Sequence, residues 1–162
     1  TKDLMLVLAK IGRNDVAYRL LHNNTFPSWG FSIKHGATSI WERWNGWTPD
    51  KGFGDPGMNS FAHYSFGAVY QWMAENIGGI RAGDVAYKKI LIKPQPDGKL
   101  TWAKTSYESI RGLIATGWKT EKDKLLLAVA IPANTTALVY IPAGSVDTVK
   151  EGGKAIKDTE GV

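Results

Sequence analysis

Apolar residues near the start of the chain recur at helical spacing. Residues 4–11, LMLVLAKI, predict the last turns of a buried helix, and Gly12 stands where a left-handed residue would end that helix. Asn14 or Asp15 is expected to cap a second helix over residues 16–23. Because short connections make neighbouring helices antiparallel, we expect an αα-hairpin here.

The next segment, residues 25–58, shows neither the helical nor the strand period. It is rich in proline and glycine. Irregular segments of this length are rare in compact domains and tend to be functional. We expect short strands within it, over residues 30–33 and 38–44.

A third helix is expected after this long loop. Asn59 or Ser60 would cap it, and its apolar side would continue to about Ile77. Two successive glycines, Gly78 and Gly79, would end it.

The hydrophobic period then changes to that of strands. Short apolar runs are separated by polar turns such as residues 96–99 and 120–123. Several short strands at such regular spacing predict an all-β sandwich, with a boundary to the helical part near residues 80–83. The expected strands span residues 87–94, 100–105, 111–119, 124–131 and 136–141.

One apolar stretch, residues 125–146, has no charged residue and is long enough to span a bilayer. It is interrupted by Pro132, Asn134 and Pro142. Because these residues break a membrane helix, we expect two strands joined by a turn and no membrane partner.

Composition excludes several function classes. The 162 residues carry a net charge of +5 without a run of basic residues, so nucleic-acid binding is not expected. There is no cysteine, and the three histidines are scattered, so neither a disulfide framework nor a structural zinc site is expected. No other metal and no cofactor is indicated. Tryptophan is unusually frequent, with seven residues in the chain.

The densest candidate for chemistry is residues 39–47, SIWERWNGW. Glu42 lies between Trp41 and Trp44, and an ionised glutamate in such a place could activate a water as general base. Aromatic rings, including Trp47, could bind the apolar faces of a sugar. The alternative is that the tryptophans are core residues and Glu42 is an ordinary ion-pair partner.

His63 is the second candidate, because it follows the long loop at the start of the expected third helix. It could hydrogen-bond a ligand hydroxyl, or it could be a core or capping histidine. His22 and His35 are expected to be structural or surface residues. Asp50 and Asp55 stand among glycines and prolines, where aspartate commonly forms turns.

Four blocks of the sequence stand out together: FPSWG (26–30), GATSIWERW (36–44), NSFAHYSFG (59–67) and YKKILIKP (87–94). These blocks resemble the C-terminal region of bacterial α-L-rhamnosidases of glycoside hydrolase family 78. The β strand pair around residues 131–136 and 140–143 is also similar to that family. The likeness covers nearly the whole chain in the same order.

The resemblance implies a mixed fold. Residues 1–81 would be the C-terminal helices and loops of an (α/α)6 catalytic barrel, and residues 82–162 an incomplete C-terminal β-sandwich domain. The family releases terminal α-L-rhamnose with inversion, so the expected partner is a rhamnose-containing glycoside. Rhamnosidase activity would belong to a longer parent, and this chain would be an inactive fragment. A fragment cut from its barrel would expose apolar surface, which is compatible with a homo-oligomer.

The resemblance also implies roles for single residues. Glu42 corresponds to the general base, and His63 to a histidine that contacts the sugar. Trp41, Trp44 and Trp47 would shape the sugar pocket. The family's general acid would lie upstream, outside this chain. Where the family usually has asparagine before the His-Tyr pair, this chain has alanine at position 62.

Two other readings remain open at this point. The chain could belong to another (α/α)6 hydrolase, similar to trehalases or glucoamylases. It could also be a non-catalytic carbohydrate-binding module, for which Trp102 and Trp118 are the tryptophans of the β part.

Overall fold

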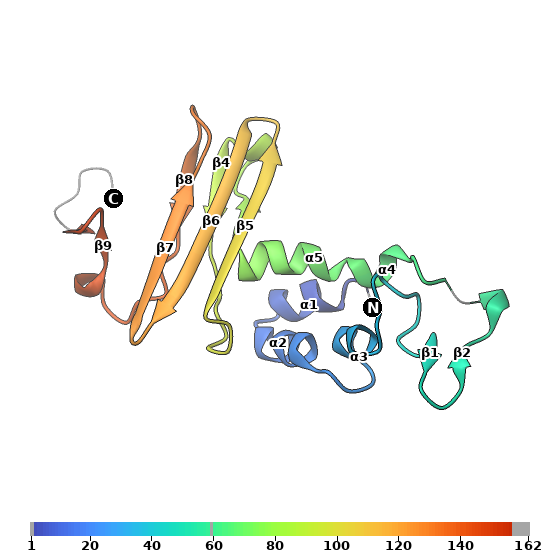
Figure 1. Cartoon of the computed structure of the whole chain (residues 1–162). Coiled ribbons are helices and arrows are strands. Elements are labelled where there is room, and N and C mark those ends of the chain that lie inside the picture. The colour runs from blue at the N-terminus through green and yellow to red at the C-terminus, as the bar shows by residue number, and fades with distance from the viewer. Residues whose placement is uncertain (1, 59, 157–162) are drawn as a thin grey trace. The chain divides into compact units, whose positions relative to one another are not determined.

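A computed structural model describes residues 2–58 and 60–156 of the chain (Figure 1). They form two compact units, divided between Met73 and Ala74. The first unit is mainly helical, and the second is built from strands. The domain boundary that the sequence predicts near residues 80–83 stays a prediction.

The helical unit contains five short helices and a small hairpin among its described residues. The elements are α1 (Leu4–Lys10), α2 (Asn14–His22), α3 (Trp29–Lys34), β1 (Trp47–Thr48), β2 (Gly52–Phe53), the 3-10 turn η1 (Pro56–Met58), α4 (Tyr64–Gly67) and α5 (Val69–Trp72).

The turn between α1 and α2 confirms the predicted helix end. Gly12 has a φ of +75°. Its N–H donates to Ala9 O at 3.1 Å, and Arg13 N–H donates to Leu8 O at 2.7 Å. This pair of bonds is the Schellman motif, which satisfies the last carbonyls of α1 and reverses the chain. The two helices therefore pack as the expected hairpin.

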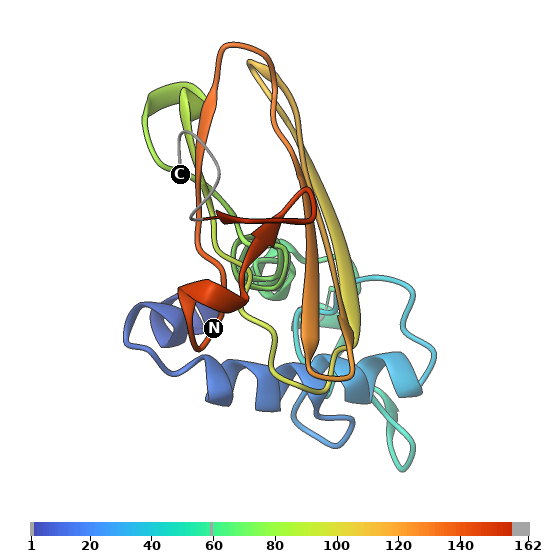
Figure 2. The ribbon, with the colours of Figure 1, turned by 90° about the vertical axis from the view of Figure 1, so that its left-hand side faces the viewer.

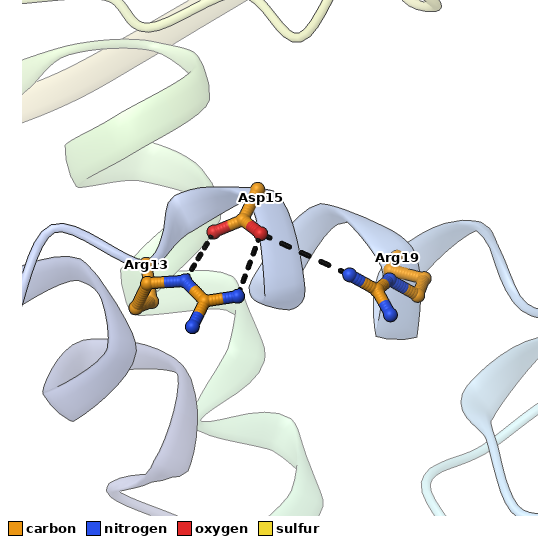
Figure 3. A network of polar contacts seen from close by, with 3 residues as sticks. All are labelled: Arg13, Asp15 and Arg19. Carbon is orange, nitrogen blue, oxygen red and sulfur yellow. Dashed lines mark hydrogen bonds and ion pairs between the residues drawn. The ribbon is translucent and has the colours of Figure 1, made fainter.

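The predicted cap of α2 is wrong. The helix begins at Asn14 itself, and Arg13 occupies the cap position without a side-chain hydrogen bond. The side chains expected to cap are engaged elsewhere. Asn14 Oδ1 accepts from Trp72 Nε1 at 3.1 Å, and the Asp15 carboxylate accepts from Arg13 at 2.8 and 2.9 Å. Figure 3 shows Asp15 between Arg13 and Arg19, the latter at 3.8 Å.

The strand expected over residues 30–33 is also wrong, because these residues belong to helix α3. Ser28 caps this helix by accepting from Phe31 N–H at 3.0 Å. Gly30 favours no regular structure by itself. A Cβ at this position would lie 2.2 Å from Asn23 O, so only glycine lets the helix approach the preceding loop this closely.

The third helix starts later than predicted. Asn59 lies outside the described residues, and Ser60 is not a cap. Helix α4 begins at Tyr64, with His63 at its cap position. The chain then continues through α5 into the π-helical turn η2 (Met73–Ile77), and Gly79 follows with a φ of +80°. The delay arises because residues 60–63 hydrogen-bond to residues 39–42 instead of joining the helix. Residues 38–44 in turn form no regular strand.

The second unit contains all five strands that the sequence predicts, within a few residues at each end. Its elements are β3 (Ile80–Ala82), η3 (Val85–Tyr87), β4 (Lys89–Ile92), β5 (Trp102–Ser109), β6 (Gly112–Glu121), β7 (Lys124–Ala130), β8 (Thr136–Val139), η4 (Val146–Thr148), β9 (Lys150–Glu151) and β10 (Lys154–Ala155).

These strands form two facing sheets. One has the order β3-β4-β8, with β4 and β8 parallel, and the other is the antiparallel meander β5-β6-β7. Figure 2 shows them as separate layers. Ile80, Ile90 and Ile92 from the first sheet meet Ile114 from the second in a buried cluster. The predicted β-sandwich is therefore confirmed as a pair of packed sheets.

The two tryptophans of this unit have opposite environments. Trp118 is buried, and its Nε1 donates to Ile77 O at 2.7 Å. Trp102, by contrast, is 62% exposed. A binding-module function would therefore have to rely on Trp102, because Trp118 holds the sheet against the turn that precedes β3.

The uncharged stretch 125–146 contains β7, a turn and β8, as expected. Thr135 Oγ1 donates to Pro132 O at 2.6 Å in that turn. Within residues 2–58 and 60–156, no helix has the length and hydropathy needed to cross a bilayer.

Candidate active site

The candidate residues are assembled by two stretches that are distant in sequence, residues 39–42 and 60–63. Glu42 N–H donates to Ser60 O at 2.8 Å, and His63 N–H donates to Ile40 O at 2.8 Å. The Ser39 hydroxyl donates to Phe61 O. These bonds give two irregular segments one fixed relative arrangement, which brings the segments carrying Glu42 and His63 together.

The Glu42 carboxylate is partly buried and is held by main chain. Its Oε2 accepts from Ser60 N–H at 2.9 Å. This charge-assisted hydrogen bond fixes the direction of the side chain. The second oxygen, Oε1, gives the side chain a further acceptor site. Oε1 is therefore the candidate proton acceptor.

His63 caps helix α4 through one of its two ring nitrogens. Its Nδ1 accepts from Ser65 N–H at 3.3 Å at the start of α4. A neutral imidazole that accepts at Nδ1 carries its proton on Nε2. Because the ring also stacks on Tyr64, with centroids 5.1 Å apart, its Nε2–H is fixed in direction. Such a group can donate to a ligand oxygen.

Trp44 belongs to an aromatic cluster with Trp29 and Phe66. Its ring stacks on Phe66 with centroids 4.5 Å apart and meets the edge of Trp29 at 5.6 Å. Trp29 Nε1 donates to Phe66 O at 3.0 Å. The Nε1 of Trp44 is buried and has no hydrogen-bond partner among the described residues. A buried indole N–H normally has an acceptor, so Trp44 is an exception among the described residues.

The other two candidate tryptophans lie in separate aromatic contacts. Trp41 is 8% exposed, and its ring meets that of Phe61 edge-on with centroids 5.3 Å apart. Phe53 also contacts Phe61, with centroids 5.4 Å apart. Trp47 contacts His35 at 5.4 Å. Trp41 therefore supports the pairing of the two site segments, whereas Trp47 packs beside α3.

The remaining histidines and aspartates are structural, as the sequence predicts. His35 Nδ1 bonds to Phe31 O at 2.8 Å, and His22 stacks on Tyr18. Asp55 Oδ1 accepts from Gly57 N–H at 2.8 Å in a turn. Asp50 lies in the turn between β1 and β2.

Two residues that the sequence did not single out take part in the site. Ser39 ties its segment to Phe61, and Ser60 holds Glu42 through its N–H. Both lie within the family-like sequence blocks, but their roles depend on a pairing between distant segments. No local pattern could have indicated that pairing.

Metal ligation has no support in the described part of the chain. Residues 2–58 and 60–156 contain no group of three or more histidine, aspartate or glutamate side chains that could hold an ion.

Comparison with known proteins identifies the family of both units. Residues 1–77 match the family described as bacterial alpha-L-rhamnosidase 6 hairpin glycosidase domain. Residues 79–156 match the family described as bacterial alpha-L-rhamnosidase C-terminal domain. The chain belongs to the bacterial α-L-rhamnosidase family. Its β unit thus corresponds to the C-terminal domain family, and its helical unit to part of the six-hairpin domain.

Individual relatives agree with this assignment. An α-L-rhamnosidase of Streptomyces avermitilis is 46% identical over 150 residues, which is 93% of this chain and 15% of the relative. One from Formosa agariphila is 42% identical over 93% of this chain and 16% of the relative. The chain therefore spans about a sixth of the length of these relatives.

A solved structure supports the same fold. The crystal structure of the S. avermitilis α-L-rhamnosidase complexed with L-rhamnose matches with a TM-score of 0.86 at 43% identity. The match covers 96% of this chain and 16% of that one.

Proposed function

We propose that this chain supplies the general base and part of the sugar site of an α-L-rhamnosidase, acting within a longer polypeptide. The observation that carries the proposal is the Glu42 carboxylate, which accepts the Ser60 N–H in a segment bonded to that of His63. The rhamnosidase relatives supply the substrate class, a terminal α-L-rhamnoside.

In the proposed reaction, Glu42 acts with inversion at the anomeric carbon. It takes a proton from a water, whose oxygen bonds to that carbon as the bond to the leaving oxygen breaks. A second carboxylic acid must protonate the leaving oxygen, and the two carboxyl groups must be far enough apart to admit the water. That acid is proposed to lie outside this chain.

His63 is proposed to position the sugar. Its Nε2–H can donate to a rhamnose hydroxyl, because Nδ1 is engaged by Ser65 N–H. Trp41, Trp44 and Trp47 are proposed to shape the pocket. Trp44 would do so through its stacked contact with Phe66, which fixes the orientation of its ring.

The same proposal assigns architecture. Residues 1–81 would complete an (α/α)6 barrel, and residues 82–162 would form a β-sandwich domain. Exposed apolar side chains on the helical unit, such as Ile33 at 67% and Tyr70 at 69%, are consistent with burial by further helices. Since the acid and most of the barrel would be missing, the 162-residue chain is expected to be inactive alone.

The stereochemical outcome tests the proposal. A longer protein containing this sequence is incubated with an aryl α-L-rhamnoside, and the first rhamnose anomer released is identified by proton NMR. The proposal predicts β-L-rhamnose, as inversion requires. Release of the α anomer would contradict the mechanism, and real turnover by the 162-residue chain would contradict its inactivity.

A substrate panel separates this proposal from another (α/α)6 hydrolase. Aryl rhamnoside, trehalose and maltooligosaccharides are offered to the same longer protein. The expected result is hydrolysis of the rhamnoside only. Preferential hydrolysis of a glucoside would support the trehalase-like or glucoamylase-like alternative.

A further inference from the structure

On the basis of the proposed function, we infer that the main-chain N–H of Ser60 and the hydroxyl of Ser39 are positioning groups for Glu42. The Ser60 N–H hydrogen-bonds to Oε2 of the carboxylate, so Oε1 is the oxygen that receives the proton from water. The Ser39 hydroxyl keeps the segment that carries this N–H in place.

The first support is the closed loop of bonds between Glu42 and Ser60. Glu42 N–H donates to Ser60 O at 2.8 Å, and Ser60 N–H donates back to Glu42 Oε2 at 2.9 Å. The carboxylate is therefore fixed relative to its own backbone as well as to the opposite segment. A glutamate side chain without this second bond would sample several rotamers.

The second support is that further contacts anchor the segment that follows Ser60 to the segment that precedes Glu42. The Ser39 hydroxyl donates to Phe61 O, and His63 N–H donates to Ile40 O at 2.8 Å. Phe61 also packs against Trp41, with ring centroids 5.3 Å apart. The residues that follow Ser60 are therefore held in place, which favours the position of its N–H beside Glu42.

The two carboxylate oxygens of Glu42 therefore have different roles. A main-chain donor stabilises the ionised carboxylate without supplying a proton of its own. Oε2 stays occupied by this donor through the reaction, whereas the water proton is transferred to Oε1. Because a backbone N–H cannot be removed by most substitutions, the identity of the Ser60 side chain matters less than its main chain.

The hydrogen bond can be tested in the 162-residue chain without any activity. The chemical shift of the Ser60 amide proton is measured by NMR in the wild type and in Glu42→Gln over a range of pH. The two shifts are expected to differ, because the carboxylate is a stronger acceptor than the amide. The Ala62 amide, which donates to Ser60 Oγ at 3.2 Å, is the internal control. A Ser60 amide whose shift is the same in both proteins at every pH would overturn the inference.

The positioning role is tested in the longer rhamnosidase. Ser60→Pro removes the N–H, and Ser60→Ala keeps it. Because misplacing a reacting group by about 1 Å can reduce a rate on the order of 100-fold, kcat of Ser60→Pro is expected to fall about 10- to 100-fold with KM little changed. Ser60→Ala should retain kcat within about 3-fold by the same argument.

A second pair of variants covers the case in which Ser60→Pro does not fold. Ser39→Ala should lower kcat several-fold at nearly constant KM, and Ser39→Thr, which keeps the hydroxyl, should restore it. Unchanged kcat in Ser39→Ala would overturn the role of Ser39. If Glu42→Gln kept full turnover, the proposed function would fail, while the NMR result would still decide the hydrogen bond.

Discussion

Glu42 and Ser60 are 18 positions apart, yet each donates a hydrogen bond to the other. One bond joins the two backbones, and the other joins a backbone N–H to the carboxylate. The candidate site is therefore a product of chain pairing in a region with little regular secondary structure. The same pairing explains why α4 starts at Tyr64, because the residues before it are already engaged.

Trp118 and Trp102 offer a matched test of packing in the β unit. Trp118→Phe leaves the Ile77 carbonyl without its buried donor, so it should lower the free energy of unfolding by about 1–3 kcal/mol. Trp102→Phe should change it by less than about 0.5 kcal/mol, because Trp102 is exposed. Urea unfolding measures both. Equal effects of the two substitutions would refute the assignment of their environments.

Two glycines with similar backbone angles should respond differently to alanine. Gly79 has a φ of +80° and Gly98 a φ of +83°. A Cβ on Gly79 would lie 2.3 Å from Pro94 N, whereas nothing lies within 4 Å of one on Gly98.

Both substitutions place an alanine in the left-handed conformation, which destabilises the folded protein by roughly 1–2 kcal/mol. Gly79→Ala should therefore destabilise clearly more than Gly98→Ala, since the backbone at Pro94 must also move. Thermal unfolding followed by circular dichroism measures the difference. A Gly79→Ala protein as stable as Gly98→Ala would show that the close approach is not present.

Ser28 should contribute measurably to the stability of the helical unit despite its small side chain. It is fully buried, accepts from Phe31 N–H and donates to Thr25 O at 2.8 Å. Ser28→Ala removes the cap of α3 and should lower stability by about 1–2 kcal/mol. Ser145→Ala, at the cap of the exposed turn η4, serves as the control and should have a smaller effect. Chemical denaturation measures the free energy of unfolding of both variants, and equal losses would contradict the role of Ser28.

The Asp15 cluster predicts a specific acid response. Its hydrogen bond with Arg13 lowers the pKa of Asp15 from 3.8 to about 2. The contribution of this carboxylate to stability is therefore complete above the ordinary pKa and is lost as the pH falls through the lowered one.

Urea unfolding of the wild type and Asp15→Asn, between neutral pH and pH about 2, isolates this contribution. The wild type should be the more stable protein at neutral pH, and the two should converge as the pH approaches the lowered pKa. The difference should be small, because the cluster is exposed to solvent. A difference that is constant with pH would contradict the assigned interaction.

Local signals were sufficient for the five predicted strands of the β unit and for the end of α1, but not for β3, β9 and β10. Gly12 ends α1 because a left-handed residue is required there, and the polar turns around Asp97 and Lys122 separate strands whose apolar alternation is regular. Asp97 accepts from Lys99 N–H at 3.0 Å, which is the turn chemistry that its sequence indicates. Such features depend on neighbours in sequence, so the sequence reveals them.

The segment that carries the site was harder to predict because its conformation depends on distant contacts. Helix α3 contains Gly30, although glycine is a poor helix former. A larger residue would not fit at this position, because the backbone of Asn23 lies against Gly30. The segment before α4 pairs with residues 39–42 rather than continuing the helical pattern. Sequence similarity located Glu42 and His63, whereas their hydrogen-bond partners required coordinates.

The most direct test of the account compares the longer rhamnosidase with its Glu42→Gln variant, using an aryl α-L-rhamnoside for turnover and calorimetry for rhamnose affinity. The amide keeps the size of the side chain but cannot accept the proton from water. Because general bases contribute roughly 100- to 10,000-fold, kcat should fall within or beyond that range while rhamnose affinity is largely retained. Glu108→Gln on exposed β5 is the control and should be fully active. Wild-type turnover by Glu42→Gln would contradict the assignment of Glu42 as the base.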